Sequence, residues 1–423
     1  MRILIHSNAP WVATGYGNQT DKLIKIFKSL GHEVAVSAFY GLAGREIVMN
    51  GVKVYPGGIE PYGTDVIAHY ARNFKADIVI TLIDNWVMNN GRNRWWEGLR
   101  WIPWAPVDHD PLPPPVYSSL ADKDGKLVPY KLLAYSKHGQ QAYGRCGLKA
   151  DYIPHCIDTD DDYYPAVDEQ GAYIARATVR EQLGLPIASD AFMVTMVAAN
   201  KGTPSRKGFA EAIEGFGRFF DKHRNAVLYL HTEATGAYQG VSIPELRGQI
   251  HAMLMSEGLV GLPRGAVIVC DQDQYKMSFP TDYMRAIYNA SDVLLSPSYG
   301  EGFGIPIAEA QACGTPVIVT DWTAMTELCH SGYKVDGQRM YDVQGSWYKV
   351  PSVKGIVKGL EWAFTMRGAK AVRDQAVKGI RDEYSLKAVT PLWKEYLDGI
   401  KADIDGAGAV SKLPSVLEAL SSE

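Results

Sequence analysis

Two acidic residues and several glycines share one short stretch of the sequence, YGEGFGIPIAEAQACGTPVIVTD, at residues 299–321. Pro306 suits the first turn of a helix, because its missing N–H would have no partner there, and Gly314 suits the helix end. The glycines therefore precede a helix N-terminus, whose free N–H groups and positive dipole attract phosphate. Glu309, about one turn into that helix, can accept two hydrogen bonds from a vicinal diol such as that of a ribose. The stretch predicts a loop, with Glu301 in it, that meets a sugar and a diphosphate.

A simpler interpretation of this stretch stays open. Glycine loops before helices are common, so the loop can also be a tight turn before a helix on which Glu309 faces the solvent. The combination of E-G-F-G, a gap of seven residues between the glutamates and E-A-x-A-x-G-x-P-V-I is far more specific than a glycine loop alone. We therefore favour the binding interpretation.

The composition is that of a folded, globular protein of more than one domain. A chain of 423 residues exceeds one ordinary core, and 46% hydrophobic with 21% charged residues is typical of globular proteins. The apolar stretches are far shorter than a membrane span, and the opening MRILIHSN is too short for a signal-peptide core. Five cysteines, never spaced C-x-x-C, favour a reducing compartment and argue against a zinc site. We expect a cytoplasmic protein without a transmembrane segment.

The first half of the chain alternates short apolar runs with helical patterns. Strands are expected at residues 3–7, 33–39 and 76–84, and an amphipathic helix within 18–32. This rhythm predicts parallel pairing and an α/β architecture. The stretch PWAPVDHDPLPPPVY, residues 103–117, carries too many prolines for a helix or a central strand, and we expect a constrained loop.

The second half repeats this rhythm from AFMVTMVAAN onward. We expect a Rossmann-like first domain over residues 1–175 and a second over 190–385, then a closing helix over 386–402 and a loose tail over 403–423. Within the second domain we expect strands at 225–233, 265–271, 292–298 and 316–321, and helices at 281–291 and 352–364.

The segment PSYGEGFGIPIAEAQACGTPVI resembles the donor-binding signature of retaining GT-B glycosyltransferases. These form the glycosyl transferases group 1 family, which includes sucrose synthase and many bacterial mannosyl- and glucosyltransferases. Weaker similarity covers most of the chain: TGYGNQTDKLIKIFKSLGHEVAV is similar to the family's opening, and IPHCID resembles its I-P-N-G-V-D link, with His155 and Cys156 as departures. The resemblance implies a GT-B fold, in which two doubly wound domains face a central cleft. The second domain would bind the donor and the first would supply most of the acceptor site.

The resemblance also implies which residues bind the donor diphosphate. VAANKGTPSRKGFAEAIEGF is similar to the segment in which an arginine and a downstream lysine hold that group, and Lys207 matches the lysine. Asn200 stands at the arginine's position, so Lys201 or Arg206 is left to supply the second contact. The alternative is that Lys207 is one more exposed lysine. Its place between a strand and a helix favours the phosphate contact.

The remaining donor contacts follow from the glycine loop. The resemblance implies that Glu301 and the backbone of Gly302 and Phe303 hold the hydroxyls of the donor sugar. Gly304 would precede the helix start at the diphosphate, and Glu309 would hold the ribose. Glu327, in DWTAMTEL, follows a segment that lacks the two glycines usual in the family, and we assign it no role.

The sequence VDHD, residues 107–110, has three interpretations. The spacing of Asp108 and Asp110 is that of a metal motif in another class of glycosyltransferases. The resemblance instead implies that His109 faces the donor sugar across the cleft. A solvated loop is the third interpretation. We expect His109 to be a site residue and no metal to be bound, because no other ligand cluster supports one.

The glycine pair near the N-terminus is a weak motif by itself. Gly15 and Gly17 would equally suit a dinucleotide cofactor, but Thr20 stands where the third glycine of that motif would be. The resemblance places this loop by the diphosphate and the acceptor, so we expect no cofactor. A tryptophan-rich stretch nearby is expected to pack in the interior, with an acceptor platform as the alternative; it comprises Trp95, Trp96, Trp101 and Trp104.

The function expected from these residues is transfer of a hexose, glucose or mannose, from a nucleotide-diphosphate sugar such as a UDP- or GDP-sugar, with retention and without a metal. The acceptor would be a sugar, a lipid-linked group or another hydroxyl. His109, Lys207 and Glu301 are the expected catalytic residues. Three alternatives stay open: a transferase acting on a modified base in DNA, an epimerase of sugar nucleotides, and a binding protein without activity. The net charge of −4 does not favour nucleic acid.

Overall fold

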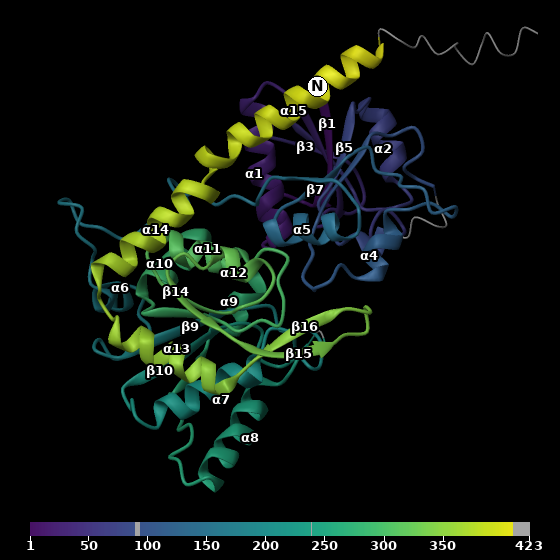
Figure 1. The fold of residues 1–423 in the computed structure, drawn as a ribbon. Coiled ribbons are helices and arrows are strands. Elements are labelled where there is room, and N and C mark those ends of the chain that lie inside the picture. The colour runs from purple at the N-terminus through teal and green to yellow at the C-terminus, as the bar shows by residue number, and fades with distance from the viewer. Residues whose placement is uncertain (89–93, 238, 409–423) are drawn as a thin grey trace, which may run out of the picture.

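The computed structural model describes residues 1–88, 94–237 and 239–408 of the chain. These residues form two α/β domains, each built around a parallel sheet (Figure 1). The first domain, coloured purple to blue, lies above the second, coloured teal to green, in this view. The expected loose tail at residues 403–423 is wrong in its first residues, because the last helix continues to residue 408, and residues 409–423 lie outside the described part.

The first domain contains an eight-stranded sheet in the order β3-β4-β2-β1-β5-β6-β7-β8. β3 and β4 are antiparallel, and the other neighbours are parallel. The inner strands are almost continuously buried, as expected for a parallel sheet covered on both faces. The strands are β1 (Arg2–Asn8), β2 (Glu33–Tyr40), β3 (Ile47–Met49), β4 (Val52–Tyr55), β5 (Ile78–Thr81), β6 (Trp101–Ala105), β7 (Leu132–Ala134) and β8 (Ala150–Tyr152).

The first helix begins earlier than the sequence predicted. We expected Gly15 and Gly17 in a loop, but both lie in α1 (Gly15–Ser29). Thr14 is the N-cap, and its side-chain oxygen accepts a hydrogen bond from the Gly17 N–H at 3.1 Å, which satisfies a free donor of the first turn. The other helical segments of this domain are α2 (Ile67–Phe74), the 3-10 helix η1 (Asn85–Met88), α4 (Pro114–Ser119) and α5 (Lys137–Arg145).

The proline-rich stretch is only partly a loop, contrary to our expectation. Its first residues belong to β6, and α4 begins at Pro114. Proline is tolerated in the first turn of a helix, because the N–H that it lacks would have no partner there. Between them, the segment from Pro106 to Pro113 has no regular structure. The four tryptophans expected in the interior are indeed buried.

The second domain contains a six-stranded parallel sheet in the order β11-β10-β9-β12-β13-β14. Its strands are β9 (Phe192–Val197), β10 (Ala226–His231), β11 (Val267–Val269), β12 (Val293–Ser296), β13 (Val317–Thr320) and β14 (Gly332–Val335). The helices around it are α6 (Arg176–Gln182), α7 (Phe209–Phe220), α8 (Ile243–Ser256), α9 (Gln272–Met277), α10 (Thr281–Ala290), α11 (Ile305–Ala312), α12 (Ala324–Leu328) and α13 (Val353–Thr365). An antiparallel hairpin that we had not predicted, β15 (Gly337–Tyr341) and β16 (Trp347–Pro351), follows β14.

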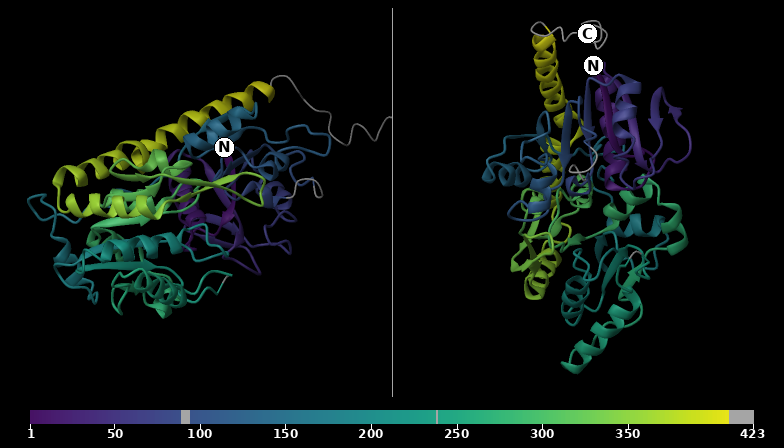
Figure 2. Two further views of the ribbon diagram at one scale, coloured as in Figure 1. Left: turned by 60° about the horizontal axis from the view of Figure 1, so that its bottom comes forward. Right: turned by 90° about the vertical axis from the view of Figure 1, so that its right-hand side faces the viewer.

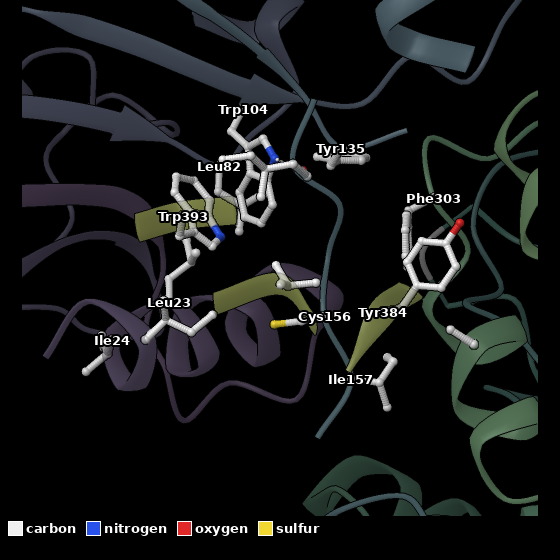
Figure 3. Packing of buried hydrophobic residues seen from close by; sticks show 14 of the residues in the cluster. Leu23, Ile24, Leu82, Trp104, Tyr135, Cys156, Ile157, Phe303, Tyr384 and Trp393 are labelled. Carbon is white, nitrogen blue, oxygen red and sulfur yellow. Dashed lines mark hydrogen bonds between the residues drawn. The ribbon is translucent and has the colours of Figure 1, made fainter. Parts of the chain in front are cut away.

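Two C-terminal helices connect the domains. α14 (Lys370–Tyr384) lies on the second domain beside α11, and α15 (Leu386–Gly408) continues along the first domain (Figures 1 and 2). Trp393 of α15 is fully buried there, with its ring 5.0 Å from that of Phe27 and 5.3 Å from that of Trp104. Figure 3 shows that this cluster continues through Tyr135 and Phe303 into the second domain. One hydrophobic core therefore spans both domains.

Candidate functional site

The site lies where the strand order of each sheet reverses. In the second domain this point is between β9 and β12, and in the first it is between β1 and β5. Open α/β sheets bind ligands beyond the carboxyl ends of their strands at such a point, because the loops diverge there. The loops after β9 and β12 carry the predicted donor residues, and the loops of the first domain face them.

Lys207 and Arg206 meet Glu301 at this point. The Lys207 ammonium lies 2.5 Å from one carboxylate oxygen of Glu301, and Arg206 Nη1 lies 3.5 Å from the other. Burial by itself would raise the pKa of Glu301, but the charges of Lys207 and Arg206 lower it below its ordinary value. Burial and the neighbouring Arg206 lower the pKa of Lys207. The two cations therefore lie close together beside the Glu301 carboxylate, and Arg206 also faces the carboxylate of Asp108 at 3.7 Å.

The glycine loop ends at the N-terminus of α11, as the sequence predicted. Gly304 has φ of +108°, a conformation that favours glycine, and α11 begins at the next residue with proline in its first turn. The other loop glycines are needed by the contact between domains. A Cβ on Gly300 would lie 2.0 Å from the carbonyl oxygen of Asp108, and a Cβ on Gly302 would lie 2.4 Å from Cβ of Pro106.

Phe303 fills the domain interface with its side chain. Only 3% of its surface is exposed, and its ring lies 5.1 Å from that of His155 and 5.6 Å from that of Tyr384. Burial lowers the pKa of His155 to about 3, so this ring is neutral. Any contact of Phe303 with a donor would therefore come from its backbone.

Glu309 lies on α11, away from the Lys207 cluster, and is 7% exposed. Its carboxylate accepts hydrogen bonds from the hydroxyls of Tyr288, at 2.8 Å, and Tyr163. Burial raises its pKa. Tyr163 also lines a hollow of about 390 Å³ between the domains, together with Trp11 and Phe279. Tyr163 therefore lies between this hollow and the Glu309 carboxylate. A larger hollow, of about 680 Å³, lies beside α14 and contains none of the predicted site residues.

His109 is fully buried at the domain interface. Its Nδ1 lies 2.8 Å from a carboxylate oxygen of Asp108, and its Nε2 lies 3.3 Å from one of Asp342. Its ring stacks on Tyr348, with centroids 3.8 Å apart. Asp342 and Tyr348 belong to the β15–β16 hairpin region, so the second domain covers the histidine that we expected to face the donor sugar.

Two residues at the first domain's reversal point were missed by the sequence reasoning. Asp84 follows β5, and its carboxyl is hydrogen-bonded to the hydroxyl of Tyr16 on α1. Burial, followed by the nearby charge of Asp108, raises the pKa of Asp84 to about 6. The sequence TLID, residues 81–84, already shows that the acidic residue Asp84 follows an apolar strand. Its place beside Asp108 and Arg206 depends on the strand order, which the sequence does not reveal.

The structure shows where Asn200, at the position of the family's arginine, and Arg206, one of the two candidates for the second phosphate contact, lie. Asn200 is buried and its amide donates to the carbonyl oxygens of Glu233 and Val241, so it holds a loop of the second domain. Arg206 instead lies beside Lys207, with 38% of its side chain exposed. Arg206 and Lys207 therefore both face the Glu301 carboxylate.

The remaining candidates lie at the edges of the site. A Cβ on Gly15 would lie 3.2 Å from the side chain of Ile305, the first residue of α11, whereas Gly17 packs against the backbone of its own loop. The Glu327 carboxylate accepts the N–H of Lys137 at 3.0 Å, at the start of α5, and so connects the domains. No group of three or more His, Cys, Asp or Glu side chains in the described ranges is placed to hold a metal ion. Nor does any described helix have the length and apolar character needed to cross a membrane.

The two facing Rossmann-like domains are the GT-B fold. Sucrose-phosphate synthase from Thermosynechococcus elongatus is similar with a TM-score of 0.68 and 15% sequence identity, over 95% of this chain and 99% of that one. HepE from Anabaena, solved in complex with UDP and glucose, is similar with a TM-score of 0.60 and 15% identity, over 94% and 100% of the two chains.

Part of the second domain matches a known family. Residues 272–380 match the family Glycosyl transferases group 1. D-inositol 3-phosphate glycosyltransferase from Streptomyces bingchenggensis is 26% identical over 164 residues, which are 38% of this chain and 36% of that protein. The match thus covers little more than a third of that relative's length.

Proposed function

We propose that this protein is a glycosyltransferase that moves a hexose from a nucleotide-diphosphate sugar to an acceptor hydroxyl, with retention and without a metal. One observation carries this proposal: Lys207 and Arg206 converge beside Glu301, next to the N-terminus of α11, at the reversal point of the second sheet. Two cations and a helix N-terminus are the groups that stabilise a departing diphosphate.

Each group has a distinct task in this proposal. The departing diphosphate gains negative charge as the glycosidic bond breaks, and Lys207, Arg206 and the α11 N–H groups stabilise that charge. Glu301 is paired with Lys207 and Arg206 in this structure. Once the diphosphate binds these two cations, Glu301 holds the sugar hydroxyls. The transition state resembles an oxocarbenium ion, so the protein mainly positions the two substrates. The positive charge of these side chains takes the place of a metal ion.

Glu309 holds the ribose in this proposal. The hollow lined by Tyr163 and Phe279 supports that role, because Tyr163 is hydrogen-bonded to Glu309 and the volume of the hollow, about 390 Å³, suits a nucleoside. The Tyr163 hydroxyl is hydrogen-bonded to the Glu309 carboxylate in this structure, so this bond would have to break for the diol to bind.

The test is a thermal-shift panel of UDP-, GDP-, ADP- and TDP-sugars, each with Mg²⁺ or with EDTA, followed by an assay for release of the nucleoside diphosphate. A donor stabilises the native state according to its occupancy. We expect one donor to raise the melting temperature equally with Mg²⁺ and with EDTA. Lys207→Met should lower turnover of that donor by roughly 10²–10³, whereas the control Lys222→Met, at an exposed lysine just after α7, should not change it.

The outcomes separate the proposal from its alternatives. A donor that binds but is never consumed with any acceptor would indicate a binding protein. Consumption without an acceptor, to an isomeric nucleotide sugar, would indicate an epimerase. Stabilisation only with Mg²⁺ would refute the metal-independent mechanism. Retention is tested by NMR of the product's anomeric configuration, and a product of inverted configuration would contradict it.

A further inference from the structure

The β15–β16 hairpin contacts both sides of the site. From the second domain, the Lys349 N–H donates to the carbonyl oxygen of Tyr299 at 2.9 Å, directly before the glycine loop. Toward the first domain, the Trp347 carbonyl accepts the N–H of Asp110 at 3.1 Å, and the Ser346 hydroxyl donates to the carbonyl of Pro111. The hairpin therefore fastens the segment that carries His109 to the donor loop.

Asp342, in the hairpin turn, is the only hairpin carboxylate directed at that segment among the described residues. One of its carboxylate oxygens lies 3.3 Å from His109 Nε2 and also accepts the Gln344 N–H at 2.9 Å. The carboxylate is 20% exposed and the imidazole is fully buried. An imidazole ring can donate to Asp342 and Asp108 together only when both nitrogens carry hydrogen.

A chain of charged contacts runs from this turn to the candidate diphosphate site. Beyond His109, the Asp108 carboxylate lies 3.7 Å from Arg206 Nη1, and the same Nη1 lies 3.5 Å from Glu301. The chain crosses the domain interface twice, since Asp342, Arg206 and Glu301 belong to the second domain and His109 and Asp108 to the first. The position of His109 and Asp108 relative to Arg206 therefore depends on a group outside their own domain.

We propose that Asp342 is a positioning residue of the transferase site, which fixes the ring of His109 and, through it, the carboxylate of Asp108 beside Arg206. This inference rests on the proposed function, because the group that it positions is the diphosphate-binding arginine. A carboxylate is needed rather than any acceptor, since it gives a charge-assisted hydrogen bond to the imidazole. The alternative role of Asp342 is purely local, namely closing the hairpin turn through the Gln344 N–H.

Two substitutions of Asp342 distinguish these roles, because each removes a different property of the side chain. Asp342→Asn keeps an oxygen for the Gln344 N–H but removes the negative charge, whereas Asp342→Glu keeps the charge and disturbs the turn. If Asp342 positions His109, Asp342→Asn should lower kcat by about tenfold, with KM for the donor changed less, as loss of one charge-assisted hydrogen bond implies. Asp342→Glu should then retain more activity than Asp342→Asn. The reverse order would overturn the proposal.

A double-mutant cycle tests whether the effect passes through His109. In a His109→Asn background, Asp342→Asn should have no further effect on kcat, because the ring that it positions is gone. An equal tenfold loss in both backgrounds would refute the positioning role. Val343→Asn, in the same turn and 99% exposed, is the matched control and should leave kcat unchanged.

Hydrogen exchange supplies a readout that needs no donor. The Asp110 amide is protected by the Trp347 carbonyl, so Asp342→Asn should speed its exchange while Val343→Asn should not. Unchanged exchange in Asp342→Asn would show that Asp342 does not hold the two segments together. If the wild-type protein consumes no nucleotide sugar while Asp342→Asn still speeds exchange of the Asp110 amide, the proposed function is refuted and the contact of Asp342 stays established.

Discussion

Replacing Lys207 tests the charge at the centre of the site. In the ligand-free protein Lys207→Met removes one charge-assisted hydrogen bond to Glu301, which is worth about 1.5–3 kcal/mol. Much of this is offset, because Arg206 still faces the same carboxylate and a largely buried ammonium, 19% exposed, no longer has to be desolvated. We therefore expect the free energy of unfolding to change by no more than about 1 kcal/mol.

Turnover should change far more than stability. In the proposed mechanism Lys207 stabilises the charge that develops as the diphosphate departs, and loss of one such group costs about 2.7–4 kcal/mol of transition-state stabilisation, or roughly 10²–10³ in kcat. In the same proposal Arg206 and the helix N-terminus also meet the donor's ground-state charge, so donor Kd should rise by less than about tenfold.

The assay measures initial rates of nucleoside diphosphate release over a range of donor concentrations, with donor Kd determined separately by calorimetry. Lys207→Arg should recover part of the rate, since it restores the charge, and Lys222→Met is the surface control. An equal loss in kcat and in donor affinity would refute the reasoning, because it would mean that Lys207 binds the donor and its transition state alike.

Three further predictions concern other parts of the molecule. Asp84→Asn should stabilise the protein by about 1–3 kcal/mol at pH 7.5, because the folded-state pKa of Asp84, about 6, lies above its unfolded value. The wild-type protein therefore loses stability as the pH rises through 6. Urea unfolding should show the gain of the variant at pH 7.5 and no such gain at pH 4. Glu309→Gln should raise donor Kd by about tenfold with kcat changed less, as measured by calorimetry and rates; unchanged Kd would exclude the ribose contact. Trp393→Ala should lower the free energy of unfolding by about 3–5 kcal/mol, and a loss below about 1 kcal/mol would show that α15 is not part of the shared core.

Local chemistry made much of the fold predictable. Pro306 and Gly314 bracket α11 because their backbone restrictions act within a few residues, and the buried strands of both sheets have apolar runs that need no knowledge of the rest of the chain. The errors were also local. The glycines after Thr14 entered a helix because that residue caps it, and α4 begins at Pro114 because a first turn tolerates proline.

The hairpin β15–β16 was not predicted, although GQRMY and WYKVP flank a short turn. The strands mix polar and apolar residues and do not form the fully apolar runs that identify the parallel strands. Its importance lies in the contact of Asp342 with His109, which joins residues 233 positions apart in the sequence.

The sequence by itself determined the loop, the helix after it and the types of group that are proposed to meet a donor: Lys207, Glu301 and Glu309. Only the tertiary structure decided which partners these groups have, because that depends on the order of strands in two sheets and on how the domains face each other. It placed Arg206 and Lys207 beside Glu301, since the loops after β9 and β12 become neighbours only when those strands pair. It also brought Asp84 to the first domain's reversal point and covered His109 with a hairpin from the second domain. Periodicity and capping act over a few residues, whereas these contacts are set by packing between segments that are distant in the chain.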